Sequence, residues 1–126
     1  MQKEVVHIEG DAPSDRPLSK AIKAGGFVFV SGTPPLDPAS GKMTEGNIEE
    51  QTVQVLENLK KALEVAGSSL DQVVKATIFC TNVAHYHRVN AIYAKYFPQD
   101  PPARTYVTMG SWPESFDIEI ECIAIC

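Results

Sequence analysis

The last eleven residues of the chain, 116–126, constrain its fold more than any other segment. Polar and apolar residues alternate there, as in a β-strand whose successive side chains point to opposite sides of a sheet. One face of this strand would be apolar along its whole length and consists of Ile118, Ile120, Cys122 and Ala124. The other face would be acidic near its start and apolar near its end, with Glu119, Glu121, Ile123 and Ile125. Because a sheet face open to water is mostly polar, both faces of this strand need a cover.

Two segments with helical periodicity can cover the first face. Asn47 is a good N-cap for one helix, with Glu50 completing a capping-box pair and Gly67 ending the helix. Its apolar face consists of Ile48, Val55, Leu59, Ala62, Leu63 and Ala66. Asn82 is expected to cap a second helix, whose buried stripe consists of Val83, Tyr86, Val89, Tyr93 and Tyr96.

The other elements complete an α+β sandwich, a mixed β-sheet with both helices on one face. Further strands are expected at residues 5–8, 27–31, 73–81 and 104–109. Gly25 and Gly26 should form a hairpin turn before the strand that Gly32 ends, and residues 33–46 a loop with room for a short strand pair. Since this chain has no third layer, another subunit is expected to cover the second face of the last strand.

Length and charge narrow the class of protein further. The 126 residues form one domain, 1–126, which is large enough to bury a core. The net charge of −5, with scattered lysines and arginines, argues against binding to nucleic acid, and no apolar run is long enough to span a membrane. The amino terminus has no signal-peptide pattern. We therefore expect a cytoplasmic protein, with the mitochondrion left open if a presequence has been removed.

The cysteines and histidines form no catalytic or metal-binding pattern. If Cys122 and Cys126 share one strand, their α-carbons are roughly 13 Å apart, which is too far for a disulfide. Together with Cys80 they are expected to be reduced, buried thiols that serve packing alone. His85 and His87 would point to nearly opposite sides of a helix, so no metal site is expected.

Arg104 is the charged residue whose position most needs an explanation. It follows a Pro-Pro pair at the start of a strand with an interior character, and a buried arginine needs an anionic partner. That partner is either Glu119 or Glu121 on a neighbouring strand, or the carboxylate of a ligand, which a guanidinium group binds with two parallel hydrogen bonds. The residues alone leave both alternatives open.

Eight motifs follow one another over nearly the whole chain: LSKAIKAG (18–25), VFVSG (28–32), PLDP (35–38), QTVQVLENL (51–59), SSLDQVVK (68–75), VNAIY (89–93), PAR (102–104) and IEIE (118–121). In this order they resemble the reactive intermediate deaminase (Rid) family, also called the L-PSP endoribonuclease family. Each motif alone would be weak, but the combination is specific.

The resemblance implies a chorismate-mutase-like fold and a homotrimer with a central β-barrel and sites in clefts between subunits. It implies the activity of a 2-iminobutanoate/2-iminopropanoate deaminase, which hydrolyses enamines and imines such as 2-aminoacrylate to 2-keto acids and ammonia, without a cofactor. By position, Arg104 would hold the substrate carboxylate and Glu119 would orient the attacking water. Ser31 and Gly32 would line the pocket, and Asn90 would border it.

This chain departs from the family pattern at both walls of that pocket. Leu18 stands where the family commonly has a tyrosine, which removes a phenolic hydroxyl. Thr105 and Tyr106 replace the Ser-x-Cys or similar pattern that commonly follows the arginine. Because Tyr106 shares strand parity with Arg104, it is expected in or against the same cleft. There it would either return a hydroxyl or narrow the cavity, and both alternatives stay open.

Three functions compete on this basis. Imine deamination is the leading interpretation, and a trimer that binds small 2-imino or 2-keto acids without turnover is the alternative. A ribonuclease would need a phosphate-binding surface and an acid–base pair, for which His85, His87 and Arg88 are the candidates. The negative net charge ranks this third function last.

Overall fold

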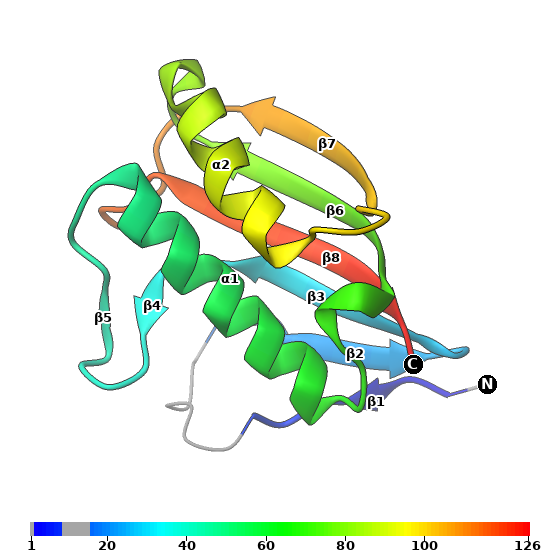
Figure 1. Cartoon of the computed structure of the whole chain (residues 1–126). Coiled ribbons are helices and arrows are strands. Elements are labelled where there is room, and N and C mark those ends of the chain that lie inside the picture. The colour runs from blue at the N-terminus through cyan, green and yellow to red at the C-terminus, as the bar shows by residue number, and fades with distance from the viewer. Residues whose placement is uncertain (1, 9–15) are drawn as a thin grey trace.

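The computed structural model of the protein describes residues 2–8 and 16–126. Both helices lie across the same face of a mixed six-stranded sheet (Figure 1), as the sequence predicts. The strands follow the order β1 (Glu4–Val5), β2 (Ala21–Ala24), β3 (Phe27–Thr33), β8 (Ile118–Ile125), β6 (Val73–Cys80) and β7 (Ala103–Thr108). β6 and β7 are parallel, while the other neighbours are antiparallel. The short pair β4 (Leu36–Asp37) and β5 (Lys42–Met43) stands apart from this sheet.

Helix α1 (Ile48–Val65) has the ends that its sequence predicts. The Asn47 side chain accepts a hydrogen bond from the Glu50 amide, and the Glu50 side chain accepts one from the Asn47 amide, so the capping box is complete. At the other end, Gly67 has a φ of 89°, a left-handed conformation that glycine adopts without strain. The amides of Gly67 and Ser68 then bond back to the carbonyls of Glu64 and Leu63.

The second helical region begins differently from the prediction. Asn82 caps a 3₁₀ turn, η2 (Val83–His85), and α2 (Tyr86–Tyr96) begins only after it. The Asn82 side chain accepts a hydrogen bond from the Ala84 amide, which tightens this turn and directs Val83 outward. The prediction that Val83 is buried is therefore wrong, because 68% of its surface is exposed. Val89 and Tyr93 are buried as expected.

β8 confirms the two-faced pattern of the last segment. Its even-numbered side chains are buried under the helices, from Ile118 to Ala124. On the other face, Ile125 pairs with Phe27 and Ile123 with Phe29. Ile125, Phe27 and Phe29 leave 47%, 41% and 43% of their surfaces exposed. We call these four residues the open apolar face; the subunit expected to cover it stays a prediction, as do the trimer and its barrel.

Several boundaries differ from the sequence prediction. Phe116 and Asp117 precede β8, because Phe116 stacks on Trp112 and the Asp117 amide bonds to the Gln51 side chain. Gly32 lies inside β3, in a stretch where the register with β8 shifts. β1 covers Glu4–Val5 in place of residues 5–8. The hairpin turn at Gly25 and Gly26 is confirmed, with φ values of 59° and 82°.

The structure also bears on the predicted burial of the three cysteines and on the predicted lack of a membrane-spanning segment. Cys80 and Cys122 are buried and free, but Cys126 is exposed, because it follows the last residue of β8. Within the part of the chain that the structure describes, no helix combines the length and the apolar character needed to cross a membrane. The cytoplasmic location stays a prediction.

Candidate functional site

Arg104 lies on β7, at the edge of the described sheet, and points toward α2. Its Nη1 donates a hydrogen bond to Asn90 Oδ1 at 2.7 Å, and its Nη2 makes a longer contact of 3.4 Å with the Tyr86 hydroxyl. The guanidinium carbon also lies 5.0 to 5.9 Å from the ring centroids of Tyr93, Tyr106 and Tyr86. These are cation–π distances, so three aromatic rings and one amide hold the cation in place.

The tyrosines around Arg104 come from one helix face and one strand. Tyr86, Asn90 and Tyr93 recur at positions i, i+4 and i+7 of α2, which places them on the same side of the helix. Tyr106 follows Arg104 by two residues on β7, and its ring meets that of Tyr86 edge to face with centroids 4.8 Å apart. The sequence predicts Tyr86 and Tyr93 only as core residues, although their spacing around Asn90 is a signal that links them to it.

No anion compensates the charge of Arg104 within the described residues. Burial raises the pKa of Tyr93 to about 12 and also raises the pKa of Tyr106, so both phenols stay protonated at neutral pH. No described carboxylate forms an ion pair with Arg104. The alternative of a salt bridge to Glu119 or Glu121 is wrong within the chain, because β6 separates β7 from β8.

The sequence leaves open whether Tyr106 returns a hydroxyl to the cleft or narrows it, and its position in the structure bears on this question. Its ring lies near Arg104, as strand parity predicts. Its hydroxyl is buried near the Cys80 thiol and has no hydrogen-bond partner in the described protein. In the single chain, the ring of Tyr106 therefore lies beside Arg104, whereas its hydroxyl points into the protein interior.

Glu119 lies at the start of β8 and belongs to the face opposite the helices. It pairs with Phe79 of β6, and its neighbours Ile118 and Ile120 are buried on the helix side. A Cβ atom at Gly32 would overlap the Glu119 carboxylate, so only glycine leaves room for that carboxylate there. Burial raises the pKa of Glu119, the negative charge of Glu121 adds to this effect, and the positive charge of Arg16 opposes it.

Ser31 precedes Gly32 in β3 and is hydrogen-bonded to the segment that contains Leu18. The Ser31 hydroxyl donates to the Ser19 carbonyl at 2.6 Å, and the Ser31 amide donates to the Lys20 carbonyl at 2.9 Å. These bonds tie the segment before β2 to the irregular part of β3. Leu18 belongs to that segment and is 56% exposed.

The predicted site residues therefore fall into two groups within one chain. We call Arg104, Asn90 and Tyr106, with Tyr86 and Tyr93, the cation half-site. We call Glu119, Gly32, Ser31 and Leu18 the carboxylate half-site. The cation half-site faces the helices, whereas Glu119 faces the opposite side of the sheet, so a single chain does not bring Arg104 and Glu119 together.

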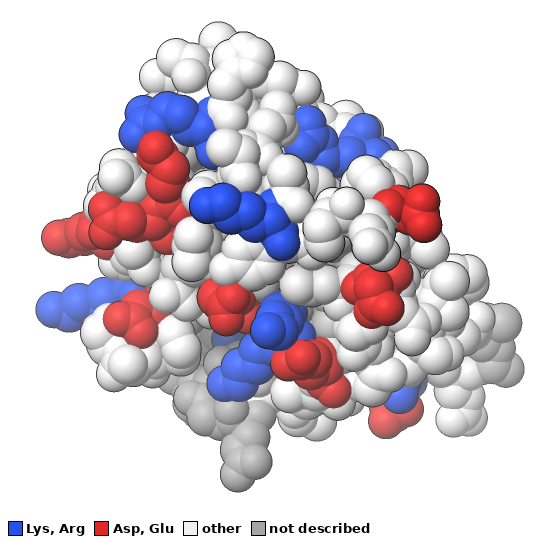
Figure 2. Space-filling view, viewed as in Figure 1, with Lys and Arg blue, Asp and Glu red and all other residues white. Residues whose placement is uncertain are grey.

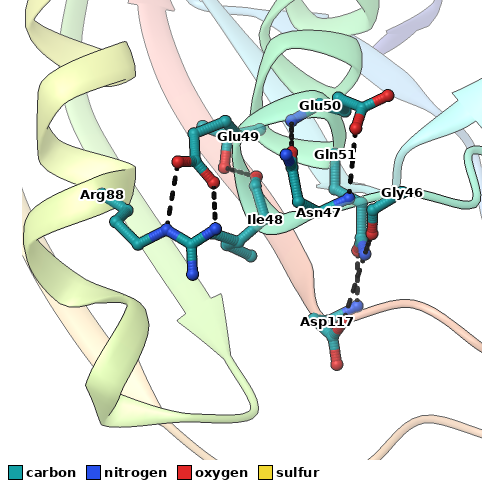
Figure 3. A network of polar contacts seen from close by, with 9 residues as sticks. Gly46, Asn47, Ile48, Glu49, Glu50, Gln51, Arg88 and Asp117 are labelled. Atoms are coloured by element: carbon teal, nitrogen blue, oxygen red, sulfur yellow. Dashed lines mark hydrogen bonds and ion pairs between the residues drawn. The ribbon is translucent and has the colours of Figure 1, made fainter.

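The residues considered for a nuclease or a metal site lie outside both half-sites. The Arg88 side chain donates two hydrogen bonds to the Glu49 carboxylate, of 2.6 and 3.0 Å (Figure 3), and these bonds lower the pKa of Glu49. On the helix-covered face, acidic and basic side chains are interspersed (Figure 2). Among residues 2–8 and 16–126, no cluster of three or more His, Cys, Asp or Glu side chains could hold a metal ion.

Comparisons with known proteins agree with this architecture. A family model described as endoribonuclease L-PSP matches residues 9–126. The chloroplastic reactive intermediate deaminase A of Arabidopsis thaliana is 44% identical over 124 residues, which are 98% of this chain and 66% of that protein. A solved structure of YyfA from Yersinia pestis, described as a member of the conserved Rid protein family, has a TM-score of 0.92 and 38% identity, covering 99% of this chain and 100% of that one. The structure of TdcF from E. coli with bound serine has a TM-score of 0.89 and 26% identity, covering 98% of both chains.

Proposed function

The chain belongs to the L-PSP endoribonuclease family, which includes reactive intermediate deaminases, and on this premise we propose that it hydrolyses 2-imino acids and their enamine forms to 2-keto acids and ammonia. The proposal depends on one observation, the set of groups that surround Arg104. A partly buried guanidinium group without a carboxylate among its described partners is a binding group for the carboxylate of a ligand.

The cation half-site would bind the part of the substrate that does not react. Asn90 and Tyr86 engage two of the five N–H donors of Arg104, so donors remain for a carboxylate. The tyrosine rings lower the local dielectric constant, which strengthens the attraction between the two charges. Bound in this way, the imine carbon next to the carboxylate is held at a fixed position.

The carboxylate half-site would supply the water. Glu119 accepts a proton from a water molecule as its oxygen attacks the imine carbon, and it then returns this proton to the nitrogen, which leaves as ammonia. The resulting carbinolamine loses ammonia and leaves a carbonyl group, so that R–C(=NH)–COO⁻ and H₂O become R–CO–COO⁻ and NH₃. A raised pKa suits Glu119 to this exchange, because a general base works best when its pKa lies near the working pH.

Because the two half-sites face opposite sides of the sheet, we place the complete site between two copies of the chain. In a homotrimer, the cation half-site of one copy would meet the carboxylate half-site of the next. The open apolar face supports this assembly, since it is the kind of surface that another subunit covers.

A second candidate function has one observation in its favour. The E. coli relative TdcF contains serine, an amino acid with an intact carboxylate and no imine. A protein that uses only its cation half-site would bind such molecules without converting them.

An assay of keto-acid release separates the two functions. A dehydratase that acts on serine or threonine generates 2-aminoacrylate or 2-iminobutanoate in situ, and the protein is then added. Faster release of the keto acid, which Arg104→Ala and Glu119→Gln each abolish, is the expected result. If release is not accelerated although calorimetry shows that the protein binds a keto acid or serine, the binding function replaces the deaminase.

A further inference from the structure

The hydroxyl group of Tyr86 lies beside Arg104 with a proton that the proposed reaction does not use. Its oxygen accepts the hydrogen bond from Arg104 Nη2, at 3.4 Å. A phenol can accept and donate at the same time, and no described residue accepts the Tyr86 proton. Tyr86 therefore has a free donor next to the cation that lacks an anion among the described residues.

The other two tyrosines of the cation half-site meet Arg104 in a different way. The guanidinium carbon lies 5.0 Å from the ring centroid of Tyr93 and 5.8 Å from that of Tyr106. The hydroxyls of both residues are buried and have no hydrogen-bond partner in the described protein. Within the described chain, the hydroxyl that is hydrogen-bonded to Arg104 is therefore that of Tyr86.

The surroundings of Tyr86 fix the direction of this hydroxyl. Tyr86 is the first residue of α2, directly after the 3₁₀ turn η2. Its half-buried ring lies between two others, edge to face, with centroid distances of 4.8 Å to Tyr106 and 5.4 Å to His87. A donor that is already held in place costs little ordering when a ligand binds.

The distance between Tyr86 and Arg104 lets one ligand atom bind to both. A carboxylate oxygen accepts from a guanidinium N–H at about 2.8 Å and from a phenol O–H at about 2.7 Å. The two donor atoms are 3.4 Å apart here, so these three distances close a triangle. Arg104 Nη1, on the other branch of the guanidinium group, is held by Asn90 at 2.7 Å.

We propose that Tyr86 is a second binding group for the carboxylate of the ligand, and that its hydroxyl donates a hydrogen bond to the oxygen that Arg104 Nη2 also binds. The proposal rests on the proposed function only for its effect on turnover, since the binding of a keto acid needs no reaction. The carboxylate is the same throughout the reaction, so the loss of this bond should raise KM and leave kcat unchanged.

The test compares Tyr86→Phe with Tyr96→Phe. Tyr86→Phe removes the hydroxyl and retains the ring with its contacts to Tyr106 and His87, so the variant is expected to fold. Tyr96→Phe is the matched control, because Tyr96 also belongs to α2 but donates its hydrogen bond to Glu57 at 2.7 Å, outside both half-sites. Calorimetry measures the affinity of each protein for pyruvate.

Tyr86→Phe is expected to weaken pyruvate binding about tenfold, because it removes a hydrogen bond to a charged group, whereas Tyr96→Phe should bind as the wild type does. Wild-type affinity in Tyr86→Phe would overturn the proposal. The same substitution in an Arg104→Lys background separates a direct contact from one that acts through Arg104. A further loss is expected there, and no further loss would show that Tyr86 only supports the guanidinium group, which would also overturn the proposal.

The imine assay distinguishes this proposal from the proposed function. If Tyr86→Phe weakens pyruvate binding in both backgrounds but the wild type does not accelerate keto-acid release, Tyr86 binds the carboxylate and the deaminase function fails. A wild type that does not bind pyruvate would overturn the roles of both Tyr86 and Arg104.

Discussion

Around Arg104, three tyrosine rings and an amide surround a cation that has no acid beside it among the described residues. Around Glu119, by contrast, a close glycine and an open sheet face surround a half-buried carboxylate. The first environment is complete within one chain, because α2 and β7 supply all of its parts. The second is open on the side where no described layer of the chain covers the sheet.

This difference indicates how the two half-sites divide the proposed reaction. The cation half-site holds its cation between three aromatic rings and an amide, which suits the binding of a group that does not change. The carboxylate half-site has an adjustable charge state, which suits proton transfer. Changes in the first should therefore alter affinity, and changes in the second should alter turnover.

The largest expected effect is the loss of affinity in Arg104→Ala. The substrate carboxylate is the same before, during and after the reaction, so the loss should appear in the binding of a stable keto acid, at about 2–5 kcal/mol. Arg104→Lys should recover only part of it, because an ammonium group cannot make the two parallel bonds of a guanidinium group. Calorimetry with pyruvate measures both; wild-type affinity in Arg104→Ala would show that Arg104 is not the carboxylate anchor.

Gly32→Ala should lower turnover without weakening keto-acid binding. The added methyl group would occupy the place of the Glu119 carboxylate and displace it, and a displacement of about 1 Å at a reacting group costs on the order of 100-fold in rate. Gly110→Ala is the matched control, because a Cβ at Gly110 meets no atom within 4 Å. Equal turnover in the two variants would show that Gly32 is not needed to position the Glu119 carboxylate.

Asn90→Asp would supply the anion that the cation half-site lacks. A carboxylate 2.7 Å from Arg104 Nη1 would compete with the ligand, so keto-acid affinity should fall about tenfold. The same variant should bind more tightly as the pH is lowered and the introduced carboxylate becomes protonated. Affinity that does not depend on pH in this variant would contradict the assignment of Asn90 as the neutral partner of Arg104.

The smallest expected effect is on stability. Because burial raises the pKa of Glu119, the folded state binds a proton more tightly than the unfolded chain, and stability falls as the pH rises from the unfolded to the folded pKa. Glu119→Gln removes this loss. Its Tm should exceed that of the wild type by a small amount at pH 8 and match it at pH 3.5, and a Tm advantage confined to acid pH would reverse the sign of the argument.

The sequence predicts the elements whose signals are local. The capping box of α1 and the alternation in β8 depend on neighbouring residues, and both are found in the structure. The outward direction of Val83 could not be predicted, because it depends on whether the Asn82 side chain closes a tight turn or caps an α-helix. The family motifs name Arg104 and Glu119 but not the opposite faces on which they lie, which follow from the strand order.

Arg16 shows the limit of sequence reasoning most clearly. Its guanidinium group forms an ion pair with the Glu114 carboxylate, 98 residues further along the chain, and neither residue belongs to a motif or a periodic pattern. The aromatic residues around Arg104 can be predicted only in part. The spacing of Tyr86, Asn90 and Tyr93 is visible in the sequence, but it also fits a buried core stripe.

The most direct test of the account is to mix two inactive variants. Arg104→Ala retains a carboxylate half-site, and Glu119→Gln retains a cation half-site. If the site forms between neighbouring copies of a homotrimer, co-assembly of equal amounts should restore keto-acid release to about one quarter of the wild-type rate, because half of the chains supply each intact side. Separately folded variants mixed without exchange of subunits serve as the control. A co-assembled mixture that stays as inactive as its two parents would contradict a site shared between copies.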